Sequence, residues 1–124
     1  MSFNWRLYIQ LANELINYKK GSFIQEAYLR SAISRSYYSV FCIARNLLIN
    51  KGTTIPMCDT HKFARKEYQN STNRIEKKVA KGLSRLWKDR KDADCENNVI
   101  IDKNRTTASY QLSLRLLGKL NKLK

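Results

Sequence analysis

The sequence predicts an all-α protein, an up-and-down bundle of four to five helices that forms a single domain over residues 1–124. Apolar residues recur at the three- and four-residue spacing that gives a helix one buried face, and no segment alternates as a half-buried strand would. Only four Gly and one Pro interrupt the chain, which favours few and long elements. Hydrophobic residues make up 43% of the sequence, which is enough to build a core.

The first helix is expected from about Phe3 to Lys20, where apolar residues repeat at helical spacing. Ser2 can act as its N-cap, and Gly21 follows at the position where glycine commonly ends a helix. Its buried face is predicted to consist of leucines and tyrosines, namely Leu7, Tyr8, Leu11, Leu15 and Tyr18.

A second and longer helix is expected from Ser22 to Lys51, because this stretch contains neither Gly nor Pro. Ser22 can cap it, with Gln25 at the capping-box position. Its main apolar stripe is Ile33, Tyr37, Phe41, Ala44 and Leu48, which Val40, Ile43 and Leu47 widen. A helix that is apolar over so much of its surface is expected at the centre of the bundle.

Gly52 and Pro56 interrupt the chain, and a short helix is expected to begin at Asp59 or Thr60. A fourth helix is expected from about Asn73, and its inner face is predicted to be Ile75, Val79, Leu83, Leu86 and Trp87. This helix is expected to end near Lys91, and the acidic residues after it are interpreted as a turn or a fraying end.

Asp102 can cap the last helix, and residues 99–101 before it are too short a run to predict a strand. The apolar face of this helix is predicted to be Ala108, Leu112, Leu116, Leu120 and Leu123. Residues 114–124 are basic and amphipathic. They could contact phosphate or an anionic membrane, or they could pack their leucines into the bundle and leave the lysines in water.

The chain is strongly basic, with 24 Lys and Arg against 10 Asp and Glu, a formal net charge of +14 and a pI near 10. Such a charge favours nucleic acid, an anionic membrane or an acidic partner, although it is also compatible with a basic protein whose charges are simply solvated. Residues 89–102 hold five of the ten acids and only two bases, Arg90 and Lys91. A surface that binds anions is therefore expected mostly outside this acidic segment.

The three cysteines, Cys42, Cys58 and Cys95, are odd in number and show no C-x-x-C spacing, so no disulfide framework is expected. Neither a signal peptide nor a membrane-spanning run is apparent, and we expect a cytoplasmic protein that does not bind membranes. Cys58 lies three residues before His61, but zinc would need two further ligands. No metal or other cofactor is predicted.

Residues 27–48 resemble the signature helix of small prokaryotic HEPN proteins, in which Arg precedes Ala-Ile-Ser-Arg, Tyr-Tyr, Phe, Ala-Arg and Leu-Leu. Here these positions are Arg30, Ala32-Ile33-Ser34-Arg35, Tyr37-Tyr38, Phe41, Ala44-Arg45 and Leu47-Leu48. Gly52, the step Thr60-His61-Lys62 and Tyr68 also fit. The run Arg90-Lys91-Asp92-Ala93-Asp94-Cys95 is similar to the Arg-x-x-Ala-Asp-Tyr motif of a HEPN subset. The resemblance extends from Trp5 to the last helix.

This resemblance implies a helical bundle that usually forms a symmetric homodimer. Many HEPN proteins are metal-independent ribonucleases of toxin–antitoxin or defence systems, and small members often pair with a minimal nucleotidyltransferase that serves as antitoxin. Active members carry an Arg followed, after four to six residues, by a His, and both protomers contribute to the site. The His can take the proton of the 2′-hydroxyl group, and the Arg can hold the scissile phosphate.

The sequence departs from this pattern because no His follows Arg90 at the required spacing, and its one His, His61, lies upstream. A catalytic version is expected to use Arg90 and Asp94 from two protomers, with Asp94 or a tyrosine as the base. Arg35, Tyr38 and Lys91 are predicted to contact nucleic acid. Three structural roles stay open: Arg90 paired with nearby acids, Arg35 paired with an internal acid or carbonyl, and the Tyr37 and Phe41 rings in the core.

Two functions are therefore carried forward. The leading hypothesis is an RNA-acting HEPN protein of a defence or toxin–antitoxin module, with metal-independent endoribonuclease activity that lacks the usual His. The alternative is a non-catalytic RNA-binding or assembly subunit of a larger ribonucleoprotein complex. The two differ in whether Arg90 is needed for turnover or whether dispersed Lys and Arg side chains bind RNA in a salt-sensitive manner.

Overall fold

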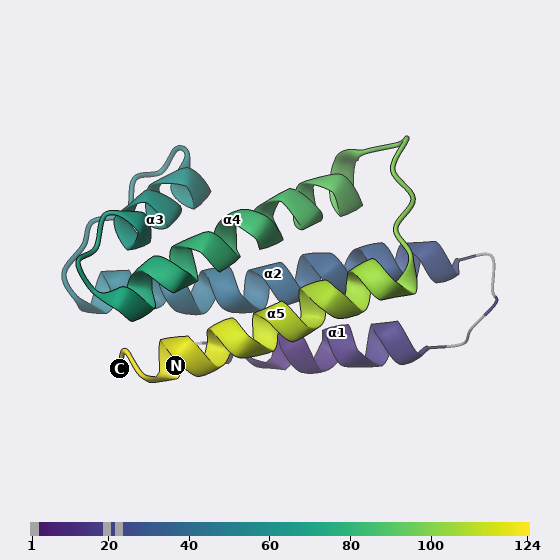
Figure 1. Cartoon of the computed structure of the whole chain (residues 1–124), viewed down its shortest axis with the longest axis horizontal. Helices are drawn as coiled ribbons and strands as arrows, with labels where there is room; N and C mark the ends of the chain where they lie inside the picture. The colour runs from purple at the N-terminus through teal and green to yellow at the C-terminus, as the bar shows by residue number, and fades with distance from the viewer. Residues whose placement is uncertain (1–2, 19–20, 22–23) are drawn as a thin grey trace.

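The computed structural model describes residues 3–18, 21 and 24–124, and within them it contains five helices and no strand (Figure 1). The helices are α1 (Leu7–Asn17), α2 (Gln25–Asn50), α3 (Thr60–Gln69), α4 (Arg74–Cys95) and α5 (Lys103–Asn121). The four longer helices run alternately up and down, and the short α3 lies against α4 (Figure 1). The prediction of an all-α bundle is confirmed.

Helix α2 forms the centre of the bundle and contacts each of the other four helices. Its predicted stripe is buried in full, from Ile33 and Tyr37 through Phe41 and Ala44 to Leu48. Val40 is buried as well, whereas Ile43 and Leu47 are partly buried beside the core. The prediction that this helix would be central is confirmed. The physical reason is that the helix is apolar over most of its circumference.

Helix α1 is shorter than predicted, and it buries a different face from the one predicted. It begins at Leu7 rather than Phe3, and its buried residues are Ile9, Ala12 and Ile16. The predicted face was wrong in part: Leu7, Leu11 and Tyr18 are 44%, 39% and 50% exposed, whereas Tyr8 and Leu15 are partly buried. Two stripes of α1 have helical spacing, and the bundle buries the one with the small Ala12, which packs with Ala32 of α2. Small residues at a contact let two helices approach closely.

The first two helices were predicted to be capped by Ser2, Gly21 and Ser22. Ser2, Lys20 and Ser22 lie outside the described residues. The Gln25 side chain accepts a hydrogen bond from the backbone N–H of Gly21 at 3.0 Å. Gly21 has a φ of 84°, in the left-handed region expected of a glycine that follows a helix.

Helix α4 begins as predicted, because the Oδ1 atom of Asn73 accepts the backbone N–H groups of Ile75 and Glu76 at 2.8 and 3.1 Å. Its predicted end was wrong, since the helix continues past Lys91 to Cys95. The segment 92–95, expected as a turn, is therefore helical.

The guanidinium of Arg30 on α2 explains the extra turn of α4. Its Nη1 atom donates to the carbonyl oxygens of Asp92, Ala93 and Glu96 at 3.0–3.1 Å, and its Nη2 atom donates to that of Val99 at 2.5 Å. The last carbonyls of a helix lack partners within the helix, and a cation that binds them stabilises its end.

A second arginine holds the acidic residues of α4. Arg105 on α5 pairs with Asp89 at 2.8 Å and with Asp92 at 2.7 Å. The hydrogen bond from Arg105 lowers the pKa of Asp92, and the hydroxyl of Ser109 donates to Asp89 at 2.6 Å. Two of the acids in residues 89–102 thus fasten α4 to α5.

Helix α5 starts at the predicted cap, since Asp102 Oδ1 accepts the backbone N–H of Arg105 at 2.8 Å. Leu116 and Leu120 are buried as predicted, but Ala108 is exposed and the small polar residues Thr106, Ser109 and Ser113 are buried instead. The α4–α5 contact is tight, because a Cβ atom added to Gly82 would lie 2.5 Å from Leu116 Cδ1.

The hydroxyl of Tyr68 gives a test of how α3 is anchored. It is buried and donates to the carbonyl oxygen of Ala44 on α2 at 2.6 Å. We expect Tyr68→Phe to lower the free energy of unfolding by about 1 kcal/mol, the usual contribution of such a bond. Urea denaturation checks this, with Tyr18→Phe at a half-exposed position as a control expected to change by less than about 0.5 kcal/mol. Equal effects in both variants would contradict the anchoring role.

Candidate functional site

Arg90 and Asp94 form an ion pair one turn apart on α4, with Nε to Oδ2 at 2.9 Å. The hydroxyl of Ser34 on α2 donates to the same carboxylate oxygen at 3.2 Å. Both predicted catalytic residues therefore come together within one chain. Because two donors engage the Asp94 carboxylate, it is placed to orient the guanidinium of Arg90.

The guanidinium of Arg90 lies against two aromatic rings. Its Cζ atom is 5.0 Å from the centroid of the Trp87 ring and 5.5 Å from that of Tyr38. Cations at this distance are attracted by the electron-rich face of an aromatic ring. The rings and Asp94 together fix a cation at the surface of α4, which was the predicted location of an anion-binding residue.

His61, in the first turn of α3, lies on the same two rings as Arg90. Its ring centroid is 4.9 Å from that of Trp87 and 5.9 Å from that of Tyr38, and the ring stacks on Phe41 at 4.2 Å. Its Nδ1 atom shares a hydrogen bond of 2.6 Å with the hydroxyl of Tyr37. The one histidine of the chain therefore shares two aromatic neighbours with Arg90, although it comes from a different helix.

The Arg-to-His spacing of the sequence motif did not identify His61 as a neighbour of the Arg90 site, because this spacing applies to two residues on one helix. The packing of α3 against α4 brings them together. A signal was present in the sequence, since the step Thr60-His61-Lys62 is part of the resemblance to HEPN proteins. The spacing of residues along one helix carries no information about a contact of this kind.

The surroundings of His61 favour its neutral form. Burial lowers the pKa of His61 below its usual value, and the positive charges of Arg90, Arg65 and Arg45 lower it further. Burial also raises the pKa of its partner Tyr37, which stays protonated. A neutral imidazole at neutral pH is able to accept a proton, and the hydrogen bond to Tyr37 fixes its orientation.

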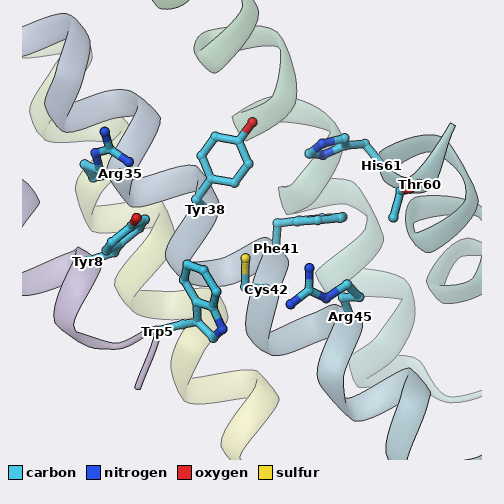
Figure 2. Close-up of a pocket in the computed structure, with 9 residues that line it drawn as sticks. All are labelled: Trp5, Tyr8, Arg35, Tyr38, Phe41, Cys42, Arg45, Thr60 and His61. Atoms are coloured by element: carbon cyan, nitrogen blue, oxygen red, sulfur yellow. The ribbon is translucent and has the colours of Figure 1, made fainter. Parts of the chain in front are cut away.

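An open pocket of about 440 Å³ lies between α2, the start of α1 and the start of α3 (Figure 2). Figure 2 shows its residues along α2, with two aromatic rings on the α1 side and His61 on the α3 side. The lining residues are Trp5, Tyr8, Arg35, Tyr38, Phe41, Cys42, Arg45, Thr60 and His61. Aromatic faces and arginines in one pocket form a surface suited to a nucleotide base and its phosphate.

Arg35 and Tyr38, which were predicted to bind nucleic acid, both line this pocket. The partner expected for Arg35 was wrong: its Cζ atom lies 5.0 Å from the centre of the Tyr8 ring, so an aromatic face replaces the predicted acid or carbonyl. Lys91, the third predicted contact, is exposed on α4 and is not among the residues that line the pocket. Tyr37 and Phe41 are buried in the core, as their structural role required.

His61 also lines a second hollow, of about 460 Å³. Its lining includes Lys62, Arg65 and Trp87 in addition to His61. The Cζ atom of Arg65 is 5.3 Å from the centre of the Trp87 ring. His61 thus lines two hollows, and each of them also contains cations.

Among the described residues, no group of three or more His, Cys, Asp or Glu side chains is arranged to hold a metal ion. Cys42 is buried, and Cys58 is exposed near the start of α3. No described helix has the length and apolar content needed to cross a membrane.

No protein-family model matches the chain, and a search of curated proteins finds no match. The likeness to HEPN proteins is thus carried by the residues of α2, α3 and α4 quoted above.

Proposed function

We propose that this chain is an RNA-acting protein of the HEPN type, in which His61 and Arg90 cleave RNA without a metal ion. The observation that carries the proposal is the placement of both side chains on the rings of Trp87 and Tyr38. A neutral base and a fixed guanidinium are the two groups that the chemistry requires. His61 replaces Asp94 as the base, since the Asp94 carboxylate already accepts from Arg90 and Ser34.

In this reaction the 2′-oxygen of the RNA forms a bond to phosphorus and the bond from phosphorus to the 5′-oxygen breaks. His61 takes the proton of the 2′-hydroxyl group, and the leaving 5′-oxygen takes a proton from solvent water. Arg90 binds the phosphate oxygens, where negative charge develops. The products are a 2′,3′-cyclic phosphate and a 5′-hydroxyl end. Arg35 and Tyr38 hold the neighbouring nucleotide in the pocket.

The biological setting follows from the resemblance to HEPN proteins. We place the protein in the cytoplasm, as a homodimer in a toxin–antitoxin or defence module, with a minimal nucleotidyltransferase as the partner that restrains it. The net charge of +14 supports RNA as the target, because cations that replace the counterions of a polyanion supply affinity.

An RNA-cleavage assay in a metal chelator tests the proposal. Wild-type protein is expected to cleave RNA and leave 2′,3′-cyclic phosphate ends, and Arg90→Ala is expected to lower the rate by about 10²-fold or more, as the loss of a group that stabilises the transition state does. Arg74→Ala, at an exposed position at the start of α4, is the control and should cleave at the wild-type rate. Cleavage that requires a metal ion, or that is unchanged in Arg90→Ala, would refute this mechanism.

A non-catalytic RNA-binding or assembly subunit is the second candidate. This candidate is favoured because the polar groups of the site already have partners within the fold. His61 shares a hydrogen bond with Tyr37 and stacks on Phe41, and Arg90 pairs with Asp94. In this case the wild-type protein binds RNA, produces no cyclic phosphate, and the Arg90→Ala variant binds as well as the wild type.

A further inference from the structure

A second cationic surface lies in the groove between α4 and α5, where the two helices pack side by side in opposite directions (Figure 1). The groove has a volume of about 290 Å³. Its edges carry Lys78, Lys81 and Arg85 from α4, and Arg115 and Lys119 from α5. Its floor consists of Gly82, Leu112 and Leu116.

This α4–α5 groove lies apart from the site of His61 and Arg90. Positions 78, 81 and 85 share one flank of α4, whereas positions 87, 90 and 94 share the opposite flank, because an α-helix turns once every 3.6 residues. The lining residues of the groove and those of the His61 pocket do not overlap. A ligand in the groove would therefore occupy a different side of the molecule.

Unlike three of the arginines described above, the cations of the groove have no acidic partner among the described residues. Arg30, Arg90 and Arg105 each pair with a carboxylate. In the part of the chain that the structure describes, none of the five groove cations forms an ion pair, and no acidic residue lines the groove. Residues 77–88 carry five basic and no acidic side chains, and α5 has no acid at all.

Unpaired charges of one sign, gathered on two adjacent helices, produce a strong local potential that attracts a polyanion. The positions of the apolar side chains argue against a membrane surface, because insertion requires exposed apolar groups beside the cations. The large apolar residues that are exposed in the described structure include Leu7, Ile49 and Leu114, and none of them lines the groove. Leu116 in the groove floor is 2% exposed and belongs to the core.

We infer that the α4–α5 groove binds the phosphate backbone of RNA and holds the substrate on the opposite flank of α4 from the proposed cleavage site. The two rows of cations would each contact phosphates, and Gly82 lets α4 and α5 pack closely enough to bring the two rows together. The inference rests on the proposed function for the identity of the polyanion. It does not require that the protein cleave RNA.

The test uses the triple variant Lys81→Gln, Arg85→Gln, Arg115→Gln and a labelled single-stranded 2′-O-methyl RNA, which lacks the hydroxyl needed for cleavage. Affinity is measured across a range of salt concentrations. We expect the variant to bind about 10-fold or more weakly, with a slope of log affinity against log salt that is smaller by about 2, as the loss of three phosphate contacts to a single strand predicts.

A control triple variant, Lys66→Gln, Arg74→Gln, Lys124→Gln, removes the same charge from exposed positions outside the groove and should keep the wild-type slope. If both triple variants lose affinity equally, net charge alone governs binding and the inference is overturned. It is also overturned if the groove variant keeps wild-type RNA affinity, or if it loses only binding to phosphatidylserine vesicles. Groove-dependent RNA binding by a protein that never cleaves RNA would uphold the groove and reject the cleavage mechanism.

Discussion

The substitution His61→Gln is expected to reduce RNA cleavage at neutral pH by a factor of about 10² to 10⁴, the range typical of a lost general base. Glutamine retains a polar group beside Tyr37 but cannot accept a proton at neutral pH. RNA affinity is expected to remain nearly unchanged, because the cations of the pocket are still present. Single-turnover cleavage rates and equilibrium binding, measured on the same RNA, separate the two effects.

The pH dependence of cleavage gives an independent readout of His61. Its pKa lies below the ordinary value of about 6.5 for histidine, so the neutral base persists as the pH falls through that value. The acidic limb of the rate profile is therefore expected below the ordinary histidine pKa, and it should be absent from the residual activity of His61→Gln. Lys66→Gln, exposed on the same helix and outside both hollows, is the control. Wild-type rates in His61→Gln would exclude the imidazole as the base.

The substitution Arg30→Met is expected to lower the free energy of unfolding by about 3 kcal/mol, because hydrogen bonds to a charged group each contribute about 1.5–3 kcal/mol and some of the freed carbonyls regain water. Methionine keeps the length and the apolar stem of the side chain. The substitution removes the hydrogen bonds to the carbonyl oxygens of residues 92, 93, 96 and 99. Urea denaturation measures the change, and faster hydrogen exchange at the Glu96 amide locates it.

Arg6→Met is the matched control for Arg30→Met. The guanidinium of Arg6 donates to Asn121 at an exposed position, and such contacts contribute little to stability. The unfolding free energy of Arg30→Lys should lie between those of Arg30→Met and Arg6→Met. A lysine ammonium group cannot reach the carbonyl oxygens of Ala93 and Val99 at the same time, as the two Nη atoms of a guanidinium do. An unfolding free energy in Arg30→Met equal to that of the wild type would show that α4 ends at Cys95 for another reason.

Those parts of the fold that depend on local sequence could be predicted. The caps at Asn73 and Asp102 are formed by side chains acting within a few residues, and both were read correctly. The stripe of α2 was predicted correctly because this helix contacts the other four, so most of its circumference is buried. The face of α1 and the end of α4 were missed, since a choice between two apolar stripes and a cap from Arg30 are decided by partners distant in sequence.

The candidate site was predicted in part for the same reason. Continuous motifs singled out Arg90, Arg35 and Tyr38, and the structure places Arg35 and Tyr38 in one pocket with Arg90 against the Tyr38 ring. The contacts of these residues were not predicted, because they join different helices. Asp94 accepts a hydrogen bond from Ser34 of α2, and Arg35 lies on the ring of Tyr8 of α1. His61 required knowledge of how α3 packs on α4, which no spacing along the chain expresses.

The side chains of α2 support every part of the proposed site. Arg30 holds the end of α4, Ser34 holds Asp94, Tyr37 holds His61, and Tyr38 lies beneath Arg90. A shift of α2 relative to its neighbours would therefore disturb all four of these contacts at once, so the position of α2 couples the end of α4 to the placement of His61 and Arg90.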